Sequence, residues 1–214
     1  MIIAVDGPAA SGKGTLARCL AERYGLAYLD TGLLYRAVGL AVLKGGGDPG
    51  DAGTAVRAAR ALDPVKLADP GLRSQAAGAA ASQVAAHEQV RAALLDFQRT
   101  FARHPPEGEK GAVLDGRDIG TVVCPDADVK LFVDASVEER ARRRWNELLG
   151  KGEPAEFEIV KSDILARDAR DGSRAAAPMK PAADAVLLDT TELDIDAAVA
   201  RAVEIVERAR AKRI

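Results

Sequence analysis

The 214-residue sequence contains very little cysteine and histidine, with two residues of each. Cys19 and Cys124 are far apart in the chain and neither lies in a Cys-x-x-Cys motif, which argues against a disulfide framework and a zinc site. His87 and His104 have no further histidine or cysteine at the spacing of metal ligands. We therefore expect two reduced thiols in a cytoplasmic protein, and no metal held directly by side chains.

Long apolar runs, a basic leader and an excess of one charge are missing as well. No stretch of about 18 consecutive apolar residues is present, so no membrane span is expected. Residues 1–6 contain no positive region ahead of the apolar residues, which argues against a secretory signal. The formal net charge of −2 lacks the basic excess typical of nucleic-acid-binding proteins. Neither membranes nor nucleic acids are therefore expected partners.

Aromatic residues make up only 4 % of the chain although 48 % of it is hydrophobic, so the core is expected to consist mainly of aliphatic residues. Short apolar runs rich in β-branched residues alternate with helical patterns, whereas residues 51–104 read mainly as helices. The apolar runs lie at residues 1–5, 27–29, 112–114, 129–133 and 185–188. This alternation predicts a three-layer α/β fold, with a central parallel sheet of about five strands flanked by helices.

Residues 7–15 read Gly-Pro-Ala-Ala-Ser-Gly-Lys-Gly-Thr and contain a phosphate-binding motif. Gly7, Gly12 and Lys13 meet the pattern Gly-x-x-x-x-Gly-Lys between a predicted strand and a predicted helix. Such a loop turns its N–H groups toward an anion, the helix N-terminus adds partial positive charge, and the lysine reaches the β- and γ-phosphates. The motif predicts a P-loop phosphotransferase. The residues expected to bind ATP are Gly7, Pro8, Ala9, Ala10, Ser11, Gly12, Lys13, Gly14 and Thr15.

Gly14 stands directly after the lysine, where phosphate loops commonly carry a hydroxyl residue that binds Mg²⁺. Without that hydroxyl, we expect Mg²⁺ to be held mainly by phosphates and water, and Thr15 to reach a phosphate. The sequence Gly-Lys-Gly-Thr resembles the form found in nucleoside monophosphate kinases.

Further segments resemble bacterial cytidylate kinases, in the order that the family shows along its chain. They read Asp-Thr-Gly-Leu-Leu-Tyr-Arg (30–36), Ala-Ser-Gln-Val-Ala-Ala (81–86), Asp-Gly-Arg-Asp-Ile-Gly-Thr-Val-Val (115–123), Arg-Asp-Ala-Arg-Asp-Gly-Ser-Arg (167–174) and Ala-Asp-Ala-Val-Leu-Leu-Asp-Thr-Thr (183–191). The resemblance implies ATP- and Mg²⁺-dependent phosphorylation of CMP and dCMP, and we expect a monomer. It also implies one kinase domain over 1–214. The expected parts are a core of 1–44, 105–144 and 172–214, a mostly helical monophosphate-binding subdomain at 45–104 and a small lid at 145–171.

The resemblance also assigns the acceptor nucleotide to a set of polar residues. Guanidinium groups grip phosphate oxygens in pairs, and a carboxylate can accept two hydrogen bonds from a ribose diol. By resemblance, the monophosphate would be held by Thr31, Arg36, Arg117 and Arg174. The ribose would lie near Arg167 and Asp171, and the cytosine edge would be read by Ser82, Arg91 and Asp118.

Lys13, Arg117 and Asp115 are the expected catalytic residues. An acceptor phosphate is already anionic at neutral pH, so alignment and charge neutralisation suffice without a general base. Asp115 would orient a magnesium-bound water, or else cap a turn.

Arg140, Arg143 and Arg144 share one face of a helix predicted over residues 136–149. Arg140 and Arg144 are expected to contact the triphosphate from the lid; a solvated basic face is the alternative.

Three alternatives stay open at this stage. Arg167 and Asp171 have the i,i+4 spacing of an ordinary surface pair. The chain fits another small P-loop kinase, acting on a different monophosphate or on an alcohol such as shikimate, and also a silent nucleotide-binding regulator. Residues 62–72 are too short for the paired strands usual in the family, which leaves the selection of CMP over UMP open.

Overall fold

Two compact units make up the chain in the computed structural model, which describes residues 1–63 and 67–211. One unit consists of Met1–Leu29 and Ala102–Ile214, and the other of Asp30–Phe101. The second unit begins with the helix at residues 31–44, which the sequence assigned to the core. The functional division into core, monophosphate-binding subdomain and lid stays a prediction.

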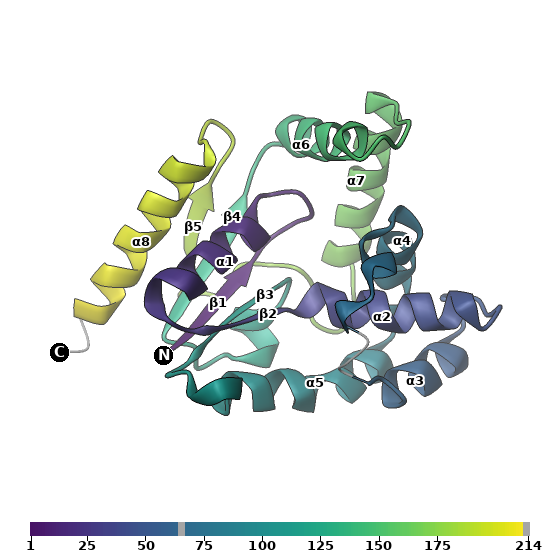
Figure 1. Ribbon diagram of the computed structural model, residues 1–214, viewed down its shortest axis with the longest axis horizontal. Coiled ribbons are helices and arrows are strands. Elements are labelled where there is room, and N and C mark those ends of the chain that lie inside the picture. Colours follow the sequence, from purple (N-terminus) through teal and green to yellow (C-terminus); the bar gives the residue numbers. More distant parts are fainter. Residues whose placement is uncertain (64–66, 212–214) are drawn as a thin grey trace. The chain divides into compact units, whose positions relative to one another are not determined.

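The first unit is built on a five-stranded sheet with the order β2-β3-β1-β4-β5 (Figure 1). Strand β1 pairs in parallel with β3 and β4, and β4 pairs in parallel with β5. The predicted α/β class with a central sheet of about five strands is therefore confirmed. The strands are β1 (Ile2–Asp6), β2 (Ala27–Asp30), β3 (Ala112–Gly116), β4 (Val129–Asp134) and β5 (Val186–Asp189).

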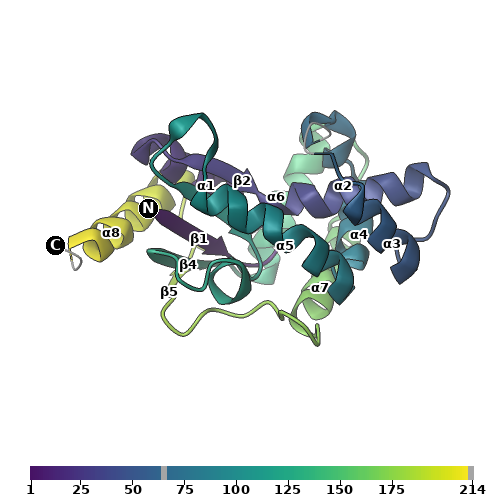
Figure 2. The ribbon, with the colours of Figure 1, turned by 90° about the horizontal axis from the view of Figure 1, so that it is seen from below.

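Helices cover the sheet because their apolar faces pack against strands that are buried along almost their whole length. Ile3 and Val5 of β1 share one core with Leu16 and Leu20 of the first helix and with Val206 of the last. In Figures 1 and 2 the yellow α8 lies beside β5, which is an edge strand of the sheet. The helical elements of this unit are α1 (Lys13–Tyr24), the 3₁₀ turn η3 (Pro106–Gly108), the π-helical turn η4 (Ile119–Val123), α6 (Val137–Gly150), α7 (Phe157–Gly172) and α8 (Ile195–Ala211).

Every regular element that begins in the second unit is an α-helix or a 3₁₀ turn among its described residues, and the sequence predicted mainly helices for residues 51–104. Leu34, Val38, Val84 and Leu94 are among the buried residues of its core. Its elements are α2 (Thr31–Lys44), α3 (Ala52–Arg60), the 3₁₀ turn η2 (Pro70–Arg73), α4 (Gln75–Val84) and α5 (Glu88–Arg103), whose last residues belong to the first unit.

The shortened segment at residues 62–72 falls partly outside the described residues, at 64–66. Its described part contains η2 and no strand. Among the residues that the structure describes, no helix combines the length and the apolar character needed to cross a membrane.

The close packing of α2 against α4 in the second unit can be tested at Gly39. A Cβ atom at Gly39 would lie 2.8 Å from the Cβ of Ala80 and 2.9 Å from its carbonyl carbon. We expect Gly39→Ala to lower the free energy of unfolding by about 1–3 kcal/mol, because the backbone of α4 must move. Gly53→Ala is the matched control: a Cβ there makes only ordinary contacts, and the better helix propensity should stabilise by roughly 0.5–1 kcal/mol. Urea titration measures both, and equal effects of the two changes would contradict this packing.

Candidate active site

The loop between β1 and α1 is pressed against the end of strand β4. A Cβ atom at Gly7 would lie 2.0 Å from the carbonyl oxygen of Val133, and the φ angle of Gly7 is +149°. Only glycine fits at such a close approach of two backbones. The loop therefore has a defined path, which the strand–loop–helix motif predicted.

Lys13, at the start of α1, is buried and points back over this loop. Its Nζ donates a hydrogen bond to the carbonyl oxygen of Pro8 at 3.2 Å and lies 3.7 Å from Oδ1 of Asp115. The structure thus brings two of the three predicted catalytic residues together. An ammonium group held above a phosphate loop is placed to bind an anion there.

The same carboxylate lies close to the glycine after the lysine. A Cβ atom at Gly14 would lie 3.0 Å from Oδ2 of Asp115 and 3.7 Å from the hydroxyl of Tyr28. A serine or threonine at position 14 would therefore compete with Asp115 for space. Thr15, which the sequence assigned to a phosphate, has an exposed side chain. Among the described residues, no three or more His, Cys, Asp or Glu side chains form a group that could hold a metal ion.

Asp171 connects two arginines that the sequence assigned to the acceptor. Its carboxylate accepts a hydrogen bond from Nε of Arg117 at 3.0 Å and another from Nη2 of Arg174. Helix α7 ends at Gly172, so Arg174 reaches Asp171 from beyond the helix. Burial alone would raise the pKa of Asp171, but the positive charges of Arg117, Arg174 and Arg167 outweigh it and lower that pKa. The group is therefore anionic at neutral pH.

The two predicted lid arginines have different surroundings. Arg140 is buried and donates to the Ala135 carbonyl (3.0 Å), to the Ala9 carbonyl of the phosphate loop (3.3 Å) and to Oδ2 of Asp168 (2.7 Å). Arg144 instead pairs with Glu147 at 2.7 Å on its own helix. In this structure Arg140 supports the loop, whereas Arg144 pairs with a residue of its own helix.

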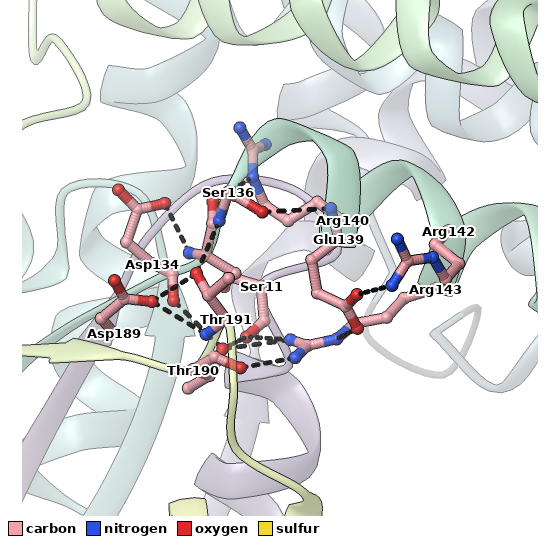
Figure 3. Close-up of polar contacts among 11 residues, drawn as sticks. Ser11, Asp134, Ser136, Glu139, Arg140, Arg142, Arg143, Asp189, Thr190 and Thr191 are labelled. Carbon is pink, nitrogen blue, oxygen red and sulfur yellow. Dashed lines mark hydrogen bonds and ion pairs between the residues drawn. The ribbon is translucent and has the colours of Figure 1, made fainter.

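Arg143 and Thr190 also hold the loop, and sequence reasoning did not select them (Figure 3). Arg143 donates from Nη2 to the Thr190 carbonyl at 2.6 Å and from Nη1 to the Thr190 hydroxyl at 3.0 Å. The Thr190 hydroxyl in turn donates to the carbonyl of Ser11 at 3.0 Å. Arg143 was visible in the sequence as a member of the basic face, and Thr190 as part of the last family segment. Their partners lie too far along the chain to be seen there.

Four of the remaining predicted acceptor residues lie in the second unit, whereas Asp118, which is buried, and Arg167 lie in the first. Arg36 donates from Nη1 to the carbonyls of Leu72 (2.8 Å) and Ser74 (3.2 Å), so the η2 turn holds its guanidinium. The guanidinium of Arg91 lies over the ring of Tyr35, with 5.8 Å between its central carbon and the ring centre. Thr31, the first residue of α2, and Ser82, in α4, are buried.

Comparisons with known proteins match the whole length of the chain. The sequence model of a family described as cytidylate kinase matches residues 3–208. A curated cytidylate kinase of Rhodopseudomonas palustris (strain ATCC BAA-98 / CGA009) is 60 % identical over 213 residues, covering 100 % of this chain and 99 % of that protein. One of Rhodospirillum rubrum is 62 % identical and covers 96 % of each chain. A solved structure of an uncharacterised protein from Eubacterium ventriosum is 14 % identical, with a TM-score of 0.55 and coverage of 97 % and 98 %, and shares the fold.

The loop-holding role of Thr190 predicts a difference between two neighbouring threonines. Thr190→Val removes the hydroxyl that bonds to Ser11, so we expect ATP to bind roughly fivefold more weakly, the equivalent of about 1 kcal/mol. Thr191→Val is the control, because the Thr191 hydroxyl bonds to Asp189 and to the N–H of Ser136, not to the loop. Titration calorimetry with ATP compares the two. Equal losses of affinity would contradict a specific role of Thr190.

Proposed function

The chain belongs to the cytidylate kinase family, and from this premise we propose that it transfers the γ-phosphoryl group of ATP to the α-phosphate of CMP or dCMP, forming ADP and the diphosphate. The observation that carries the proposal lies within the first unit. A phosphate loop closed by Lys13 and Asp115 occurs there together with the Arg117–Asp171–Arg174 cluster.

The phosphate loop, residues 7–15, holds the triphosphate in this proposal. Lys13 neutralises the β- and γ-phosphates, and Arg140 and Arg144 contact ATP from the lid side. The hydrogen bond from Arg140 to the carbonyl of Ala9 supports a place for this arginine at the donor nucleotide.

The residues around Gly14 fit a hydrated magnesium ion. Mg²⁺ usually keeps several waters and takes one or two carboxylates together with substrate phosphates. Asp115, which lies beside Lys13 and fills the space next to Gly14, would hold it through water. When bound, the ion neutralises part of the charge on the phosphates.

The acceptor phosphate is assigned to Thr31, Arg36, Arg117 and Arg174, which can offer paired donors to its oxygens. Arg167 and Asp171 bind the ribose, and the anionic state of Asp171 supports its role as an acceptor for the hydroxyl groups. Ser82, Arg91 and Asp118 read the cytosine. Each of these three side chains is buried within its own unit.

Alignment and charge neutralisation carry the reaction. The acceptor phosphate needs no base, and the positive side chains offset the repulsion between two anionic nucleotides. The lid, residues 145–171, would exclude water, which otherwise competes as acceptor. The protein is proposed to act as a cytoplasmic monomer.

A panel of acceptors tests the activity directly. With ATP and Mg²⁺, CMP and dCMP should yield ADP in a coupled assay, whereas UMP, AMP and shikimate should be poorer acceptors. Lys13→Ala should lower turnover by about 10²–10³-fold or more, because it removes a charge that acts on the transferred group, and should leave CMP binding unchanged. Preference for shikimate or AMP would overturn the proposal. Undiminished turnover by Lys13→Ala would overturn the assignment of the loop.

Asp171 allows a test of the acceptor site alone. Asp171→Ala removes the proposed ribose acceptor and the partner of two arginines, so the KM for CMP should rise about tenfold or more, the loss expected for a hydrogen bond to a charged group. The KM for ATP should stay the same. Asp163→Asn, an exposed position on the same helix, is the control and should change neither value. An equal rise of both KM values in Asp171→Ala would contradict a role confined to the acceptor.

A further inference from the structure

A buried carboxylate at the end of β1 bonds to the turn that follows β3. Oδ1 of Asp6 accepts a hydrogen bond from the N–H of Ile119, and Oδ2 accepts one from the N–H of Gly120, each at 2.7 Å. Asp6 is only 4 % exposed. These two residues begin the π-helical turn η4, whose first N–H groups have no partner within the turn. The side chain of Asp6 satisfies both.

The held turn comes directly after two residues assigned to the acceptor nucleotide. Arg117 and Asp118 lie between the end of β3 at Gly116 and the start of η4 at Ile119. The backbone of this short segment is therefore fixed on both sides. On one side Gly116 is paired with Asp6 in the sheet, and on the other side the Asp6 carboxylate holds Ile119 and Gly120.

We propose that Asp6 is a positioning residue for the acceptor nucleotide, because it sets the backbone from which Arg117 and Asp118 project. The inference rests on the proposed function, in which Arg117 binds the acceptor phosphate and Asp118 the cytosine. In this role Asp6 acts through the backbone of Ile119 and Gly120 and not by direct contact with a nucleotide. It also directly precedes Gly7, so the same strand end carries the donor loop and orders the acceptor segment.

A carboxylate suits the geometry of this contact. Each N–H bonds to its own oxygen, and asparagine would replace one of these oxygens by an NH₂ group that cannot accept. A buried N–H left without a partner costs about 1–3 kcal/mol. Asp6→Asn therefore preserves the size of the side chain and releases one end of the turn.

The charge of Asp6 is itself costly at this place. Burial raises the pKa of Asp6 to about 7 against the opposing effect of its two N–H donors, and the nearby carboxylates of Asp118 and Asp115 add to the rise. A Cβ atom at Gly120 would lie 3.2 Å from Cδ of Lys130 and 3.4 Å from Oδ2 of Asp6, but the Lys130 ammonium bonds to Asp184 and to the carbonyl of Pro125. Costly buried charges of this kind occur preferentially at functional sites.

Steady-state kinetics of Asp6→Asn test the proposal, with Asp128→Asn as the matched control. Asp128 Oδ2 accepts the N–H of Ile2 at 2.6 Å, so it is also an aspartate that holds backbone, at the opposite end of β1. We expect Asp6→Asn to lower kcat/KM for CMP roughly ten- to hundredfold and to change the KM for ATP less than about twofold. Asp128→Asn should change stability only. Equal effects of Asp6→Asn on both substrates, or none, would overturn the proposal.

The pH dependence separates positioning from general loss of stability. Protonated Asp6 resembles asparagine, so the ratio of kcat/KM of the unchanged protein to that of Asp6→Asn should be greatest above about pH 8 and approach one below about pH 6. The titration of the CMP phosphate, with a pKa of about 6, affects both proteins and cancels in the ratio. A ratio that does not change with pH would contradict the proposal.

The unchanged protein supplies the deciding measurement should Asp6→Asn fail to fold. Addition of CMP should slow hydrogen exchange of the Ile119 and Gly120 amides, which Asp6 holds, and leave the Ile2 amide at Asp128 unaffected. No change at Ile119 and Gly120 would overturn the positioning role. If the unchanged protein turns over no CMP at all, the proposed kinase function is wrong. That outcome differs from a failure of the positioning role alone, in which CMP is still phosphorylated.

Discussion

The contact between Gly7 and the carbonyl of Val133 is the constraint on which the donor side of the molecule depends. It leaves no room for a side chain and presses the phosphate loop onto the end of β4. A loop that binds an anion must turn its carbonyl groups away from that anion. Lys13 bonds to the carbonyl of Pro8, Arg140 to that of Ala9, and Thr190 to that of Ser11. Side chains from three parts of the chain thus hold the loop in one shape.

The small net charge of the chain conceals strong local charges within the first unit. Lys13 lies beside Asp115, and Arg117 and Arg174 share Asp171, so the cationic groups that are proposed to bind phosphates already have anionic partners. Such pairing lowers the cost of burying arginine. A bound monophosphate would then add negative charge to a cluster that is already ordered, which favours alignment over rearrangement.

In the second unit, backbone carbonyls at the end of the shortened segment and just after it bind the guanidinium of Arg36. The 3₁₀ turn η2 and the start of α4 offer the carbonyls of Leu72 and Ser74 to Arg36. Gly78 lies against the same guanidinium, since a Cβ atom there would come within 3.1 Å of its Nη2. A brief turn and a glycine on a helix can therefore order an arginine without the paired strands usual in the family.

Local patterns in the sequence determined the strands, the principal helices and the phosphate loop. Their boundaries follow from short-range periodicity and from glycine and proline, which act within a few residues. The family segments supplied the prediction of the acceptor residues, because the types and the order of those segments were all visible in the chain. The same patterns placed Arg143 on a basic helix face. They could not show whether its guanidinium faces solvent or bonds to another part of the chain.

Tertiary structure alone decided the strand order β2-β3-β1-β4-β5 and the contacts that cross it. Asp6 is separated from Ile119 by 113 positions, and Thr190 from Ser11 by 179. No periodicity extends over such separations. The parallel ends of β1, β3 and β4 bring these segments to one edge of the sheet, and only there do a buried aspartate and a threonine acquire partners. The carboxylate of Asp115 beside Gly14 likewise becomes visible only in the folded chain.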